Sequence, residues 1–61
     1  MIDKNLLVAG MQLHHSNLGY VAITEECIHL NNIASESGSC FVQHDGEIKE
    51  ITTSLLQYTF G

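Results

Sequence analysis

Proline, tryptophan and arginine are absent from this chain, and its only lysines are Lys4 and Lys49. Without proline, turns depend on glycine, asparagine and serine. Two lysines far apart in the sequence cannot form a basic patch. Binding to nucleic acid or to an anionic membrane surface is therefore not expected. Seven acidic residues give a formal net charge of −5, a sign that fits a basic protein partner better.

Long apolar runs are also absent. No stretch approaches the roughly 20 apolar residues that span a bilayer, and the first residues do not resemble a signal peptide. A cytoplasmic location is the resulting prediction. In a reducing compartment the two cysteines, Cys27 and Cys40, are expected to be free thiols.

The chain has 61 residues, which allows one small domain over residues 1–61. Hydrophobic residues make up 44% of it, so a packed core is expected rather than disorder. A core this small leaves a thin margin of stability, and small domains often add a partner subunit. We therefore expect a homo-oligomer.

Alternation of apolar and polar residues predicts about five short strands. Serine, asparagine and glycine at residues 16–19 predict a turn, and residues 31–38, the most polar part, predict an exposed loop. Glu25 and Glu26 are expected to form a tight connection or bulge. The segments with strand character are residues 11–15, 20–24, 27–31, 39–44, 47–52 and 57–60.

The dipeptide Asp45-Gly46 is the clearest local signal, because a two-residue type I′ turn needs positive φ twice. A hairpin is predicted around it, in which Cys40 faces Ile51, Val42 faces Lys49 and His44 faces Glu47. A bulged loop would instead pair Val42 with Ile48 or Phe41 with Ile51, and the sequence leaves both registers open. After the hairpin, Thr52, Thr53 or Ser54 is expected to cap a helical turn through Leu55 and Leu56.

The order of these segments resembles SH3-like small β-barrels. The resemblance rests on Gly10-Met11, on Gly19-Tyr20-Val21, on the Asp45-Gly46 hairpin and on Ser54-Leu55-Leu56 before a last strand. It implies a mainly β fold, either a small five-stranded SH3-like barrel or a highly curved antiparallel sheet with one short helical turn near the C-terminus. It implies no particular function, since such barrels serve many.

Two cysteines and two histidines form the one candidate metal site in the sequence. If residues 27–31 form a strand, Cys27 and His29 share one face, as Cys40 and His44 do on theirs, and the four side chains could surround zinc. Their spacing is unlike usual ligand pairs, so the prediction is no metal and no cofactor, with this set as the alternative. For nucleophilic catalysis the nearest set is Cys40, His44 and Asp45, and no catalytic residue is predicted from it.

The remaining candidate site is a surface that binds a partner. Six acidic residues and one tyrosine are predicted to bind a partner: Tyr20, Glu25, Glu26, Glu36, Asp45, Glu47 and Glu50. In size and charge the chain resembles small acidic inhibitors carried by phages and mobile elements. We expect a non-catalytic protein-interaction module, self-associating or inhibiting a basic host protein. The alternative is a small oligomeric enzyme or a zinc-binding domain with its site at a subunit interface.

Overall fold

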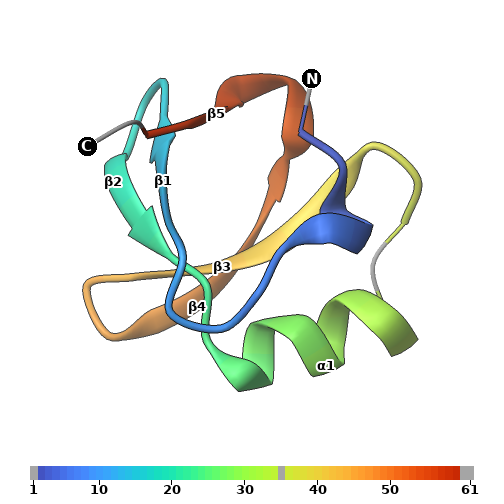
Figure 1. Ribbon diagram of the computed structural model, residues 1–61. Helices are drawn as coiled ribbons and strands as arrows, with labels where there is room; N and C mark the ends of the chain where they lie inside the picture. Colours follow the sequence, from blue (N-terminus) through green and yellow to red (C-terminus); the bar gives the residue numbers. More distant parts are fainter. Residues whose placement is uncertain (1, 35, 60–61) are drawn as a thin grey trace.

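The computed structural model describes residues 2–34 and 36–59. Five strands form one antiparallel sheet in the order β4-β3-β2-β1-β5. The strands are β1 (Gln12–His15), β2 (Gly19–Ala22), β3 (Ser39–His44), β4 (Glu47–Thr52) and β5 (Leu56–Tyr58). The sheet bends strongly, so that β3 and β4 run across the direction of β1 and β2 (Figure 1). The predicted mainly β, five-stranded, highly curved antiparallel fold is confirmed.

The first two strands meet at the predicted turn. Gly19 adopts φ +83°, a left-handed conformation that glycine enters without strain. His15 is buried just before the turn, and its Nδ1 accepts the N–H groups of Asn17 and Leu18, both at 3.1 Å. The His15 side chain therefore accepts hydrogen bonds from two backbone N–H groups of the turn.

The β3–β4 hairpin turns at Asp45 (φ +52°) and Gly46 (φ +77°), as the dipeptide predicted. Cys40 pairs with Ile51, Val42 with Lys49 and His44 with Glu47. The tight two-residue register is thus confirmed, and the bulged register is wrong.

Residues 27–31 are not a strand. They lie in the helix α1 (Glu25–Ile33), so the predicted third strand and the bulge at Glu25 and Glu26 are both wrong. Thr24 caps the helix, its Oγ1 accepting the Cys27 N–H at 3.2 Å, and the two glutamates occupy the first turn, where the helix dipole favours negative charge. These local effects outweigh a short alternating pattern.

The predicted loop over residues 31–38 is shorter than expected, because α1 continues to Ile33; residue 35 lies outside the described residues. The predicted helical turn near the C-terminus is the 3-10 helix η2 (Thr53–Leu55). Its N-cap, Thr52, makes no side-chain capping bond. The last strand ends at Tyr58, and the predicted strand residue Phe60 lies outside the described part.

The last strand pairs with the first. Leu13 lies opposite Tyr58 and His15 opposite Leu56. Beyond the strand ends, Thr59 Oγ1 donates to the Gln12 carbonyl at 2.8 Å, a contact between residues 47 positions apart. This pairing leaves β4 and β5 as the two edges of the sheet.

One core lies inside the curved sheet, and α1 covers its lower end in Figure 1. Leu13, Cys27, Cys40 and Val42 are completely buried. Both cysteines are free thiols in this core, as predicted. A second, short 3-10 helix, η1 (Lys4–Leu6), precedes β1. No helix within the described residues is long and apolar enough to cross a membrane.

Candidate interaction surface

The charges are distributed unequally between surface and interior. All seven acidic side chains are exposed, whereas both lysines are half-buried. Lys4 points back onto the protein, since its Nζ donates to the carbonyls of Glu36 (2.6 Å) and Ser39 (3.3 Å). Negative groups therefore predominate among the fully exposed side chains.

Two of the predicted partner-binding residues lie together at the turn of the β3–β4 hairpin. Asp45 lies in the turn and Glu47 follows it at the start of β4, and 86% of the Asp45 side chain is exposed. We call Asp45 and Glu47 the acidic tip. Tyr20, which is 63% exposed, lies on β2, two residues before Ala22, which pairs with Gln43 of β3.

The other four predicted residues lie elsewhere. Glu36 and Glu50 are at the opposite end of the hairpin, where the Ser39 hydroxyl contacts the Glu36 carbonyl oxygen (3.2 Å) and Glu50 Oε2 (3.1 Å). Glu25 and Glu26 begin α1. The predicted acidic surface therefore divides into three groups.

His44 borders the acidic tip. Its Nδ1 is buried without a hydrogen-bond partner and lies 3.7 Å from Asp45 Oδ2. The cross-strand neighbour of His44 is Glu47. The imidazole is thus adjacent to the Asp45 carboxylate, and Glu47 is its partner in the strand register.

The alternative zinc set is not brought together. Because residues 27 and 29 are two positions apart on a helix, Cys27 faces the core while His29 is exposed on another side. Cys40 and His44 are four residues, about 13 Å, apart along β3. Across residues 2–34 and 36–59, no group of three or more histidine, cysteine or acidic residues is arranged to hold a metal ion.

The same geometry separates the thiol of Cys40 from His44 and Asp45. Burial raises the pKa of Cys40 from 9.0 to about 11; the nearby Lys4 lowers it and Cys27 raises it further. The thiol is therefore protonated at neutral pH and inaccessible. Cys40 does not have the environment of a nucleophile.

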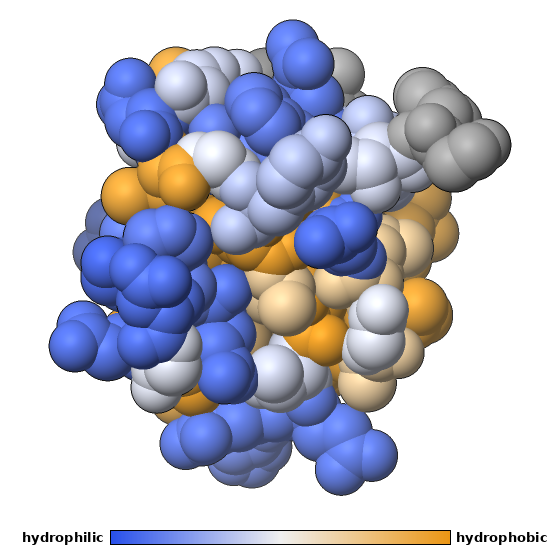
Figure 2. Space-filling model, turned by 90° about the vertical axis from the view of Figure 1, so that its left-hand side faces the viewer, coloured by the Kyte–Doolittle hydropathy of each residue, from blue (hydrophilic) through white to orange (hydrophobic). Residues whose placement is uncertain are grey.

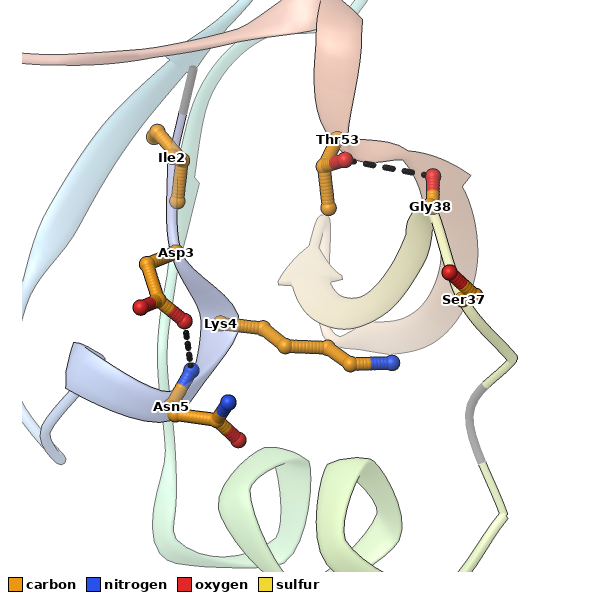
Figure 3. A pocket seen from close by; sticks show the side chains of 7 residues that line it. All are labelled: Ile2, Asp3, Lys4, Asn5, Ser37, Gly38 and Thr53. Atoms are coloured by element: carbon orange, nitrogen blue, oxygen red, sulfur yellow. Dashed lines mark hydrogen bonds between the residues drawn. The ribbon is translucent and has the colours of Figure 1, made fainter.

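A groove of about 430 Å³ lies between the N-terminal segment and the loop before β3 (Figure 3). Its polar groups are largely used within the protein. The Lys4 side chain extends across the groove toward that loop, Asp3 accepts the Asn5 N–H (2.9 Å) and Thr53 Oγ1 donates to the Gly38 carbonyl (3.2 Å). The two hydrogen bonds from Lys4 hold the N-terminal segment against the start of β3 and the loop before it. We call these contacts the seam.

We expect Lys4→Met to lower the free energy of unfolding by about 1–2 kcal/mol, because two hydrogen bonds from a charged group are lost. Lys49→Met removes the same charge without affecting this seam and is the matched control. Urea denaturation of both variants gives the difference. Equal destabilisation by the two substitutions would show that charge, not the seam, is responsible.

Sequence reasoning did not select the outer surface of β5, β1, β2 and β3 as a site. Side chains on this face follow the strand pairings: Gln57, His14 and Tyr20 form one row, and Gln12, Ala22 and Gln43 form the next. His14 and Tyr20 are in edge-to-face contact, with ring centroids 5.3 Å apart. We call these six residues the outer face. The alternation of exposed Gln12 and His14 with buried Leu13 and His15 was a visible signal for it.

None of the six residues is an aspartate, glutamate, lysine or arginine. Figure 2 views the side of the molecule that carries β2 and the hairpin turn. Strongly hydrophilic side chains gather at its left and lower parts, and hydrophobic ones in the middle and at the right. Within residues 2–34 and 36–59, the large hydrophobic side chains that remain exposed are Leu6, Val8, Tyr20, Ile33 and Tyr58.

Comparison with protein-family models, with curated proteins and with solved structures found no match to this chain.

Proposed function

We propose that this protein is a non-catalytic interaction module that binds a basic protein through the acidic tip. The observation that carries the proposal is the exposure of all seven carboxylates while both lysines are half-buried. Opposite charge steers such a partner toward the surface and raises the association rate.

The tip is the part of this surface best built for recognition. The type I′ turn holds Asp45 outward, and Glu47 follows within the same hairpin. Tyr20, on the strand next to β3, adds an exposed aromatic ring, and tyrosine is enriched at the centres of protein interfaces. Two exposed carboxylates suit an arginine- or lysine-rich segment. Inhibition of a basic protein is the consequence expected if that segment is functional.

Fluorescence anisotropy with a labelled peptide rich in arginine and lysine tests the proposal. Binding is expected to weaken as salt rises. The double variant Asp45→Asn, Glu47→Gln is expected to weaken it about 5- to 10-fold, because each exposed charge pair contributes up to about 1 kcal/mol. Asparagine preserves the turn, since Asn-Gly also forms type I′ turns.

The matched control is Glu25→Gln, Glu26→Gln, which removes two charges from the start of α1 instead. It is expected to change binding much less. The proposal fails if the peptide does not bind at low salt. It also fails if the two double variants lose affinity equally, since binding would then depend only on net charge.

A further inference from the structure

We infer that the outer face is a self-association surface, which binds the same face of a second copy of this chain. This inference does not depend on the basic partner proposed above. It rests on the distribution of charge over the fold and on the chemistry of six side chains, five of them exposed and Gln43 half-buried.

The first step concerns repulsion. Two copies that each carry a formal charge of −5 repel one another, and contacts that place carboxylates together are disfavoured. Carboxylates occupy the start of η1, α1, the loop before β3 and both ends of the β3–β4 hairpin. The outer face spans β5, β1, β2 and β3 without one. Copies can meet there with the least electrostatic opposition.

The second step concerns complementarity. In a two-fold dimer each patch must complement itself. Glutamine amides donate and accept hydrogen bonds, so the same residue can bind its symmetry copy, and this face has three of them: Gln12, Gln43 and Gln57. Tyr20, at one end of its row, is the exposed aromatic side chain of this face and is in edge-to-face contact with the ring of His14.

The third step concerns size. A standard interface buries about 800 Å² per partner, roughly a fifth of the 3946 Å² surface of this chain. Five exposed residues and one half-buried one provide less than that. We therefore expect a weak dimer that dissociates on dilution.

Sedimentation equilibrium at concentrations up to about 1 mM, at low and at high sodium chloride, tests the inference. Dimerisation is expected to strengthen as salt screens the repulsion between the copies. Binding of the basic peptide has the opposite salt dependence. The two proposals can therefore fail separately.

The decisive variant is Gln12→Glu, Gln57→Glu, which keeps side-chain shape and puts carboxylates into the interface. The dimer dissociation constant is expected to rise at least about tenfold. The control is Asn5→Asp, Asn32→Asp, the same change at two exposed positions outside the face. A protein that stays monomeric at the highest concentration and salt overturns the inference. So does equal weakening by both variants.

Discussion

Replacing Asn31 by alanine is expected to lower the free energy of unfolding by about 2–3 kcal/mol. The Asn31 side chain bonds to the backbone of Phe41 in β3, two residues from Gln43, where β3 pairs with β2. Its Oδ1 accepts the Phe41 N–H at 2.6 Å, and its Nδ2 donates to the Phe41 carbonyl at 3.5 Å. Alanine leaves both backbone groups of Phe41 without this partner in a half-buried position.

Asn32→Ala is the natural control for this prediction, since Asn32 is the exposed neighbour on the same helix. Alanine improves helix propensity at both positions, so the difference between the variants isolates the contacts with Phe41. Asn31→Asp keeps an acceptor for the Phe41 N–H, so its stability is expected to lie between those of the alanine variant and the wild type. Thermal or urea unfolding gives the ranking. Similar stabilities of the two alanine variants would contradict the role assigned to Asn31.

A second large effect is expected at alkaline pH. The pKa of Cys40 is raised from 9.0 to about 11 in the folded protein because the thiolate is poorly solvated in the core. Above about pH 9 the unfolded chain therefore loses this proton while the folded chain retains it. The resulting stabilisation is complete below pH 9 and is lost as pH rises toward 11. The loss is about 2–3 kcal/mol, at 1.36 kcal/mol for each unit of pKa.

Urea denaturation at a series of pH values from 8 to 11 measures this loss. The control is Cys40→Ala, which starts less stable because it leaves space in the core but has no thiol to ionise at this position. Its stability is expected to fall less steeply over the same range. If both proteins lose stability in parallel, ionisation of another group is the cause.

Local turn chemistry made much of the fold predictable. Asp45-Gly46 determined the hairpin because few dipeptides adopt two positive φ values cheaply, and the observed register follows from a two-residue turn. The helix α1 was missed because Ile28 and Leu30 alternate with polar residues over a stretch too short to distinguish periods. Thr24 followed by two glutamates was the available signal for a helix start.

The candidate site was predictable only in part. Exposure of acidic residues follows from their chemistry, but their division into three groups depends on pairings between distant strands. The strand β2, which carries Tyr20, becomes a neighbour of β3 through the pairing of Ala22 with Gln43, which no local pattern reveals. The contact of Asn31 with Phe41 was equally hidden, since that residue was expected at the end of a strand rather than inside a helix.

The side-by-side position of the first and last strands has a consequence for how the chain folds. The β3–β4 hairpin closes over two residues, whereas His14 must find Gln57, more than 40 residues away. Closing so long a loop has a large entropic cost that only the completed pairing offsets. We therefore expect the hairpin to form early and the meeting of β1 with β5 to set the folding rate. The edge strand β5 would then be the last part to become protected from solvent.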